Sequence, residues 1–347
     1  MKCWNIIEQV LRNPTVRMER ESTSLHCGDG GVSLEIDGRI VRQGGCRRQQ
    51  FFRYHRYPKD EYGIDIAGMT RMGFGSFAEG FIADAFKMAG VFYATQVPVT
   101  IVRTSPGGVQ YRVNGYIDFL LKNEEGRPEV AELKTTGQFG EKGVIVGTAG
   151  APLCPKVDHV LQVVPYIDWL TLPNQGIPIE KARANILYLS REGKPMQHTV
   201  SLAPGSRHVV ITNDAGTIQW THITPEKIYQ DFDGLADAIS SGTPPPPDYE
   251  LQWSRDTVLW KYKHNEFNKT DTETIKRKID AGDPGKLLDG GDWQCGYCPF
   301  QKGCWYPSPN FKPRPLDEPG QLVASVALPS GSVQAPARVA VAGIPGD

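Results

Sequence analysis

The stretch from 115 to 134 constrains the fold of this chain more than any other. An apolar run ends at Asp118, a polar segment rich in turn-forming residues follows at 123–128, and a second apolar run leads to Glu132 and Lys134. Two apolar runs joined in this way predict a β-hairpin. The hairpin sets Asp118 beside Glu132 and Lys134, which share a strand face because side chains two positions apart point the same way.

Two carboxylates and an amine at one place suggest a site for a hard cation. Mg²⁺ prefers oxygen ligands, keeps several waters and is usually completed by phosphate oxygens of a substrate. Such a metal polarises a phosphate and lowers the pKa of a bound water, while Lys134 would orient that water or neutralise developing charge. The alternative is a solvated hairpin with a cross-strand ion pair. The site hypothesis is therefore phosphodiester hydrolysis.

Charge and hydropathy limit the classes of function. The 347 residues include 38 basic and 39 acidic side chains, which is no global signature of polyanion binding. Contacts with nucleic acid would therefore come from local patches. No apolar run is long enough to span a bilayer, and residues 1–13 lack the segments of a signal peptide. We expect a cytoplasmic protein without a membrane partner, located in the host cytoplasm if a phage encodes it.

One such patch extends from 42 to 59. It holds six Arg or Lys residues and no acid, and the aromatic residues Phe51, Phe52, Tyr54 and Tyr57 are interleaved with them. Basic groups hold phosphates and aromatic rings stack on unpaired bases, a combination that suits single-stranded nucleic acid. The alternative is that the aromatic residues belong to the core and the arginines are solvated. We expect some of each, with Phe51 and Phe52 mainly in the core.

Residues 70–89 have the spacing of an amphipathic helix. Its apolar stripe is expected to consist of Phe77, Phe81, Ala85 and Met88. Glu79 lies off this stripe, so it is either an ordinary exposed acid or a third carboxylate for the metal. A strand is expected at 96–102, immediately before the hairpin.

A second helix is predicted at 157–170. Gln162 and Tyr166 lie four residues apart and therefore on one face of it. Asp158 is a candidate N-cap. Pro165 lies between the two polar residues, and it is expected to kink the helix or to end its regular part.

Local patterns predict the other elements. In chain order they are a short helix within 1–20, a hairpin turn at Asp37 and Gly38, a glycine-rich loop at 137–150 that orders with substrate, a buried strand at 184–190, further strands within 196–221, and a helix from Thr224 to about Ser240. From residue 307 onward the chain is rich in Pro, Ala, Val, Ser and Gly, and we expect it to be disordered.

The cysteines carry a second chemical signal. The chain has seven of them and is too long to need disulfide staples, which favours metal ligation or free thiols. Cys295 and Cys298 have chelate spacing and Cys304 adds a third thiolate. The candidates for a fourth ligand are Cys3, Cys27, Cys46 and Cys154. Thiolate ligation fits either Zn²⁺ or an iron–sulfur cluster.

In this order, the motifs resemble the RecB-like branch of the PD-(D/E)XK nucleases. The similarity is to its iron–sulfur members: the CRISPR-associated RecB-like exonucleases, the AddB nuclease domain and related phage exonucleases. That family has a cysteine before an Arg and aromatic run, a His or Glu on an early helix, an Asp before a Glu-x-Lys strand, a Gln and a Tyr on the next helix, and three clustered cysteines. The matching residues are Cys46, Glu79, Asp118, Glu132, Lys134, Gln162, Tyr166, Cys295, Cys298 and Cys304.

The resemblance implies an α/β fold, in which a mixed sheet flanked by helices forms a restriction-endonuclease-like core closed by a cysteine-ligated cluster. It divides the chain into an N-terminal extension at 1–41, a nuclease domain at 42–306 and a disordered tail at 307–347. The [4Fe–4S] cluster would be structural. Its ligands would be Cys46, Cys295, Cys298 and Cys304.

The resemblance also assigns roles at the hairpin. Asp118, Glu132 and Glu79 would ligate Mg²⁺ or Mn²⁺, and Lys134 would assist the attacking water. Gln162 and Tyr166, on the following helix, would contact DNA or orient Lys134.

The implied function is a metal-dependent DNA exonuclease acting on single strands or DNA ends in recombination, repair or phage DNA processing. Recombination or CRISPR-type proteins are candidate partners. One alternative is a module that binds DNA or a recombination partner on a nuclease fold without cutting. Another is a zinc-stabilised endonuclease.

Overall fold

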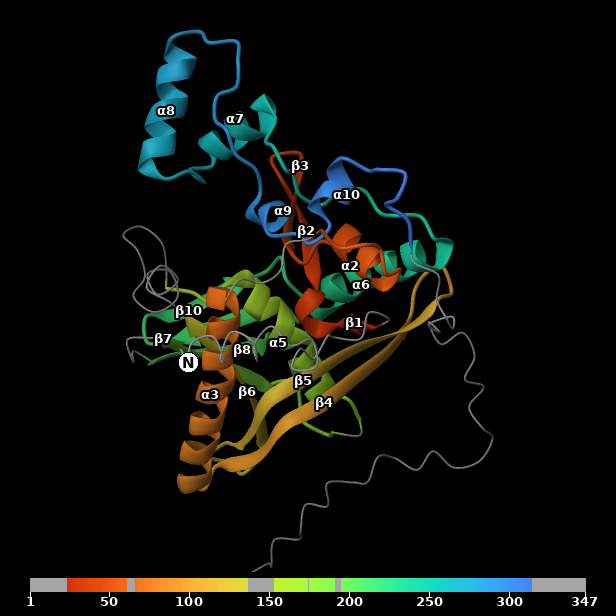
Figure 1. The fold of residues 1–347 in the computed structure, drawn as a ribbon. Coiled ribbons are helices and arrows are strands. Elements are labelled where there is room, and N and C mark those ends of the chain that lie inside the picture. The colour runs from red at the N-terminus through yellow and green to blue at the C-terminus, as the bar shows by residue number, and fades with distance from the viewer. Residues whose placement is uncertain (1–23, 61–65, 137–152, 174, 191–194, 314–347) are drawn as a thin grey trace, which may run out of the picture.

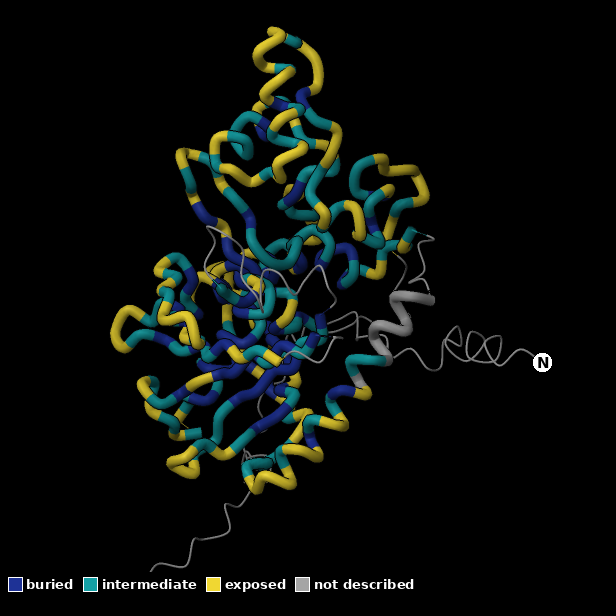
Figure 2. The backbone as a smooth tube through the Cα atoms, turned by 90° about the vertical axis from the view of Figure 1, so that its left-hand side faces the viewer, coloured by how far each residue is buried: buried dark blue, intermediate teal, exposed yellow. Residues whose placement is uncertain are grey.

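The computed structural model describes residues 24–60, 66–136, 153–173, 175–190 and 195–313. Within these ranges eight strands form one mixed sheet, and helices lie against both of its faces (Figure 1). The expected α/β architecture with a mixed sheet flanked by helices is therefore confirmed. The most buried backbone lies in the central strands, whereas the lobe at the other end is largely half-buried or exposed (Figure 2).

The predicted hairpin is present, and its two strands lie between β4 and β7 in the sheet. Strands β5 (Gln110–Lys122) and β6 (Pro128–Thr136) pair antiparallel, and the long strand β4 (Phe92–Thr104) pairs with the other edge of β5. The side chain of Asn123 accepts hydrogen bonds from the amides of Glu125 and Arg127, which closes the turn. The expected strand at 96–102 is thus the middle of a longer one.

The sheet continues from β6 through β7 (Arg183–Ser190), which runs parallel to it. The connection between these strands contains helix α5 (Val157–Leu170). Strands β8 (Pro195–Leu202), β9 (Val209–Asn213) and β10 (Gly216–Trp220) then follow as an antiparallel meander. The predicted strands at 184–190 and within 196–221 are confirmed.

Helix α5 buries an apolar face against the sheet. Val160, Val163 and Ile167 are fully buried in the main core. The helix runs past Pro165 to Leu170, so the expectation that proline ends it is wrong; Pro165 is itself buried among these apolar residues. The N-cap position belongs to Lys156, with no side-chain cap hydrogen bond, so the prediction of Asp158 as N-cap is also wrong.

Helix α3 (Ile66–Met88) packs on β4, β5 and β6, but with a different stripe from the predicted one. The side chains that contact Phe119 and Leu133 of the sheet belong to Ala78, Ile82 and Phe86. The predicted stripe is exposed instead: the exposed fractions are 74% for Phe77, 64% for Phe81 and 90% for Met88. Both sets follow the helical period, so the period alone does not say which stripe faces the sheet.

The chain before residue 42 also contributes to the core. Strand β1 (Leu25–His26) pairs in parallel with β5, and the short 3-10 helix η2 (Cys27–Asp29) follows it. Strands β2 (Gly31–Ile36) and β3 (Arg39–Gly44) form a separate hairpin. Its turn residues, Asp37 and Gly38, both have positive φ, as predicted for this pair. The packed region therefore starts before the expected boundary at 42; the helix expected within 1–20 lies outside the described residues.

The other helices build a lobe beside the sheet. Helix α2 (Arg47–Tyr54) lies next to α6 (Pro225–Ser241), which begins at the expected Thr224 N-cap. Helices α7 (Arg255–Lys263) and α8 (Lys269–Asp280) project from the body (Figure 1), and they share a small core of Val258, Ile275 and Leu287. The short helices α9 (Trp293–Gly296) and α10 (Gln301–Trp305) follow.

The first residues of the predicted tail are packed, which corrects the expectation that the chain is disordered from residue 307 onward. Phe311 packs edge-on against Phe52 and also contacts Tyr57, so the segment after 307 belongs to the packed lobe. The rest of the predicted tail, 314–347, lies outside the described residues. Among the helices that are described, none is long and apolar enough to cross a membrane.

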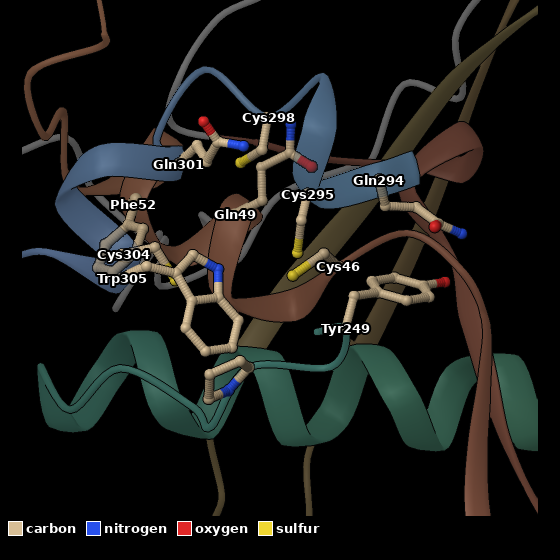
Figure 3. Close-up of a pocket in the computed structure, with 11 residues that line it drawn as sticks. Cys46, Gln49, Phe52, Tyr249, Gln294, Cys295, Cys298, Gln301, Cys304 and Trp305 are labelled. Carbon is tan, nitrogen blue, oxygen red and sulfur yellow. The ribbon is translucent and has the colours of Figure 1, made fainter. Parts of the chain in front are cut away.

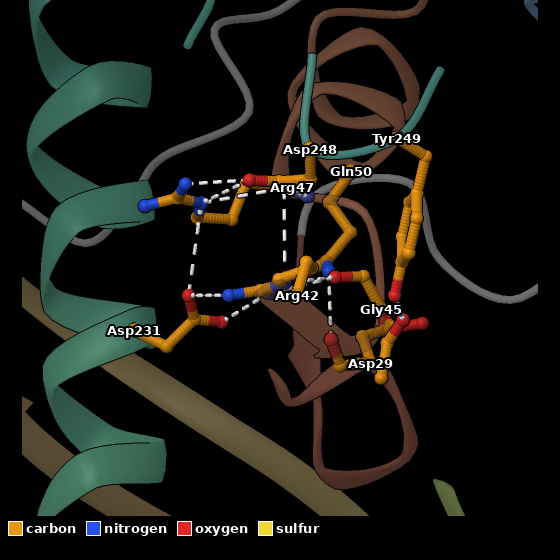
Figure 4. A network of polar contacts seen from close by, with 9 residues as sticks. Asp29, Arg42, Gly45, Arg47, Gln50, Asp231, Asp248 and Tyr249 are labelled. Carbon is orange, nitrogen blue, oxygen red and sulfur yellow. Dashed lines mark hydrogen bonds and ion pairs between the residues drawn. The ribbon is translucent and has the colours of Figure 1, made fainter. Parts of the chain in front are cut away.

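A buried ion-pair network joins β3, α2 and α6 (Figure 4). The guanidinium of Arg42 donates to both carboxylate oxygens of Asp231, with 2.7 Å between Nη2 and Oδ2, and to the carbonyl of Gly45. Asp248 accepts from the backbone amide of Arg47 at 2.7 Å. The exposed fractions of the Arg42 and Asp231 side chains are 3% and 6%. Each charge is thus removed from water and depends on its partner.

We predict that Asp231→Asn lowers the free energy of unfolding by about 3–5 kcal/mol, because it leaves the buried Arg42 charge without its main partner. Urea denaturation followed by circular dichroism would measure this loss. Asp37→Asn is the matched control, since Asp37 pairs with Lys263 in an exposed turn where an ion pair contributes little. An equal effect of the two substitutions would contradict the prediction.

Candidate functional site

The predicted carboxylates meet where β5 and β6 separate. The last pair in their ladder is Phe119 with Ala131, so Asp118 and Glu132 come immediately beyond it. In place of a backbone partner, the amide of Leu133 donates to Asp118 Oδ2 at 2.9 Å. The end of the ladder thus turns Asp118 toward β6, next to Glu132.

Lys134 and Gln162 complete a closed polar triangle with Glu132. Lys134 Nζ lies 2.7 Å from Glu132 Oε1 and 3.0 Å from Gln162 Oε1, and Gln162 Nε2 donates to Glu132 Oε1 at 2.7 Å. Successive side chains of β6 point to opposite faces of the sheet. Leu133 therefore packs with α3 on one face, while Glu132 and Lys134 face α5 on the other. Gln162 therefore orients Lys134, one of the two roles expected for it.

Glu132 is a buried acid with an incomplete set of partners. Its exposed fraction is 2%, and its Oε2 atom has no hydrogen-bond partner among the described residues. Burial raises the pKa of Glu132 to about 7, and the nearby Asp118 carboxylate adds to this, although the Lys134 ammonium opposes it. Burial likewise raises the pKa of Asp118. A buried carboxylate oxygen without a partner is rare in proteins and suits a position that holds a cation.

Glu79 reaches the same place from α3. The amide of Gln96 lies 3.5 Å from both Glu79 Oε2 and Asp118 Oδ1. Burial and then the Asp118 charge raise the pKa of Glu79. Glu79 is half-buried near Asp118, so it is not an ordinary exposed acid. Its expected role as a third metal ligand stays a prediction.

Tyr166 holds the strand that carries Asp118. Its hydroxyl donates to the carbonyl of Tyr116 at 3.1 Å. Its ring lies so close to Gly115 that a Cβ there would be 2.6 Å from Cε1, so only glycine fits. With an exposed fraction of 2%, Tyr166 is too buried for the DNA contact that was one of its expected roles.

His159 is a polar neighbour that the sequence reasoning missed. It lies one helical turn before Gln162, and its Nδ1 is 2.6 Å from the hydroxyl of Tyr188 on β7. The signal was present in the spacing, because positions 159, 162 and 166 fall on one face of a helix.

Across the part of the chain that the structure describes, no three His, Cys, Asp or Glu side chains stand together as a set that could hold one metal ion. A magnesium site does not require three, since Mg²⁺ commonly takes one or two carboxylates and completes its shell with water and substrate phosphate. The donor set of Asp118 and Glu132, with its unpartnered oxygen, fits such an ion.

The four cysteines of the predicted cluster line one pocket (Figure 3). Cys46 lies at the N-cap of α2, Cys295 lies in α9, Cys298 follows it, and Cys304 lies in α10. Their sulfurs come from both ends of the domain, and Trp305 and Tyr249 help to line the pocket. Burial raises the pKa of Cys295 and of Cys298 to about 12, and the nearby Cys46 contributes to both shifts.

The other fourth-ligand candidates lie elsewhere or outside the described residues. Cys27 is fully buried in the main core beside Gly115, and burial strongly raises the pKa of its thiol. Cys154 lies near Tyr188, and Cys3 is not among the described residues. Of the four candidates, Cys46 is thus the one that the structure places with Cys295, Cys298 and Cys304.

The basic and aromatic stretch at 42–59 is mainly structural. Phe51, Phe52 and Tyr54 are buried, as expected for the first two, and cannot stack on bases. Arg42, Arg47 and Arg53 are engaged in ion pairs with Asp231, Asp248 and Asp29. The hypothesis that this stretch as a whole grips single-stranded nucleic acid is therefore disfavoured.

Comparisons with known proteins give little beyond this geometry. No protein-family profile matches the chain, and no curated protein matches it. Among solved structures, the chain is similar to one described as the crystal structure of SSO0001, with 12% sequence identity and a TM-score of 0.39, over 77% of this chain and 96% of that one.

Proposed function

We propose that this protein is a divalent-metal-dependent nuclease of the PD-(D/E)XK type that hydrolyses DNA at single strands or ends. The observation that carries the proposal is the buried group of Asp118, Glu132 and Lys134, in which one carboxylate oxygen of Glu132 has no hydrogen-bond partner among the described residues. An acid, a Glu-x-Lys strand and a Gln from the next helix stand together in the arrangement that the sequence resemblance implies.

Each residue at the site has a separate task. Asp118 and Glu132 would hold the cation, and Glu79 would add negative charge from α3. A bound divalent ion would polarise the scissile phosphate and acidify a water. The Lys134 ammonium, fixed by Glu132 and Gln162, stabilises the charge that develops on the phosphate oxygens. Tyr166 keeps β5 in place and so fixes the position of Asp118.

The cysteine pocket supports the second half of the proposal, an iron–sulfur cluster of structural role. Four thiols surround one pocket, and none of them is in a disulfide. A cluster distributes its thiolates over several iron atoms, whereas Zn²⁺ gathers four sulfurs about 2.3 Å from one centre. Because Cys46 is far in sequence from Cys295, Cys298 and Cys304, ligation would tie the two ends of the domain together.

We predict that Lys134→Ala and Asp118→Ala each lower divalent-dependent cleavage of labelled single-stranded DNA by about 100-fold or more, because each removes charge stabilisation or a metal ligand. DNA binding should persist, since phosphate contacts elsewhere set affinity. The assay is digestion with Mg²⁺ or Mn²⁺, paired with fluorescence anisotropy for binding. Lys122→Ala, on the exposed end of β5, is the matched control.

Cleavage near the wild-type rate in both variants would disprove the site. Binding without cleavage in the wild-type protein under all divalent conditions would favour the non-cleaving DNA-binding alternative.

We predict that Cys46→Ala and Cys295→Ala each remove iron and acid-labile sulfide from anaerobically purified protein and reduce soluble yield, because cluster binding is coupled to folding. Cys154→Ala, outside the pocket, should keep both. Cys27→Ala should keep its iron, although its buried position makes some loss of stability expected. Zinc in place of iron, or iron content unchanged in all four variants, would refute the iron–sulfur assignment while leaving the hairpin site untouched.

A further inference from the structure

Helix α5 presents a row of three polar side chains to the sheet. His159, Gln162 and Tyr166 lie on one face, and each contacts a different strand. Tyr166 bonds the backbone of β5, Gln162 bonds Glu132 and Lys134 on β6, and His159 bonds Tyr188 on β7. The nuclease mechanism above uses the second and third of these residues but leaves His159 without a task.

The hydrogen bonds around Tyr188 fix the protonation of His159. The backbone amide of Lys156 donates to the Tyr188 hydroxyl oxygen at 3.0 Å, so this oxygen already acts as an acceptor. Tyr188 is 1% exposed, so its hydroxyl proton needs an acceptor inside the protein. Among the described residues, His159 Nδ1, 2.6 Å away, is the acceptor within reach. Because a neutral imidazole has one donor and one acceptor nitrogen, Nδ1 as acceptor places the ring proton on Nε2.

His159 also lies beside Lys134. Tyr188 is the direct register partner of Lys134 in the β6–β7 ladder, so the residue that bonds His159 neighbours the lysine. Burial, and after it the charges of Lys134 and Lys156, lowers the pKa of His159 to about 3, which keeps the ring neutral. Lys134 has a side-chain exposed fraction of 21%, and His159 is also partly exposed.

The remaining edge of the ring carries a hydrogen-bond donor at Nε2. Among the described residues, none accepts a hydrogen bond from His159 Nε2. An N–H donor next to an ammonium, with a second lysine at position 156, suits an anion more than a neutral group. In a nuclease, the anion that arrives beside the active-site lysine is a phosphate of the substrate strand.

We propose, on the basis of the nuclease function above, that His159 is a substrate-binding residue. Its Nε2–H donates to a phosphate oxygen of the DNA strand, next to the phosphate oxygen that Lys134 contacts. Tyr188 holds the ring in the donor tautomer. The contact exists in both the bound ground state and the transition state, so it sets affinity more than the rate of the chemical step.

Two substitutions separate this contact from a structural role. His159→Asn keeps an acceptor for Tyr188 near Nδ1 but loses the donor at Nε2, whereas His159→Gln places an amide N–H near Nε2. Binding of a labelled single-stranded oligonucleotide would be measured by anisotropy in EDTA, and KM and kcat by digestion with Mg²⁺. His208→Asn, at a partly exposed histidine before β9, controls for the change of residue type.

We expect His159→Asn to raise Kd and KM about tenfold, the loss of one hydrogen bond to a charged group, with kcat within about threefold of wild type. His159→Gln should bind within about threefold of wild type, and both variants should melt near the wild-type temperature. The proposal fails if His159→Asn binds like the wild-type protein, or if His159→Gln is weakened as much as His159→Asn.

The wild-type protein distinguishes this failure from a failure of the nuclease proposal. If it cleaves DNA and His159→Asn behaves normally, only the role of His159 is disproved. If it neither binds nor cleaves, the nuclease function is disproved and the role of His159 with it.

Discussion

The buried carboxylate of Glu132 is the constraint on which the site depends. A charge on an inner strand is expensive to remove from water, and Lys134 and Gln162 offset this cost through one oxygen only. In the part of the chain that the structure describes, Oε2 has no hydrogen-bond partner. Apolar packing at this position would usually be at least as stable. The sheet therefore carries an unfavourable group at a position where a bound cation would offset its cost, a pattern typical of functional sites.

The geometry around Glu132 comes from two irregular features of otherwise regular elements. The β5–β6 ladder ends at Phe119 and Ala131, although β5 continues beyond it, and the side chain of Asp118 accepts from the amide of Leu133 instead. Helix α5 crosses three neighbouring strands and bonds each of them through a polar side chain, so the strands keep fixed positions relative to one another. Pro165 is tolerated in this helix because tertiary packing buries it among apolar neighbours, whereas an isolated helix would break there.

The cysteine pocket depends on a different set of contacts. Cys46 follows β3, and hydrogen bonds on both sides of it hold the backbone. Before it, the carbonyl of Gly44 accepts from the Tyr249 hydroxyl and the carbonyl of Gly45 accepts from the Arg42 guanidinium. After it, the backbone amide of Arg47 donates to Asp248. Arg42 in turn is neutralised by Asp231 of α6. The ion-pair network thus brings the start of α2 to the segment that precedes α7, and the pocket forms where α9 and α10 close over it.

The sequence by itself determined the β-hairpin, the proximity of Asp118 to Glu132 and Lys134, and the face shared by Gln162 and Tyr166, because these depend on local periodicity and turn chemistry. It also determined the close spacing of Cys295, Cys298 and Cys304. Only the tertiary structure decided which stripe of α3 is buried, since Phe77 and Ala78 both begin stripes of helical period and contact with the sheet buries the second. It also decided that Cys46 and not Cys27 joins the pocket, and that His159 lies beside Lys134. Those choices rest on contacts between residues distant in sequence, which no local pattern encodes.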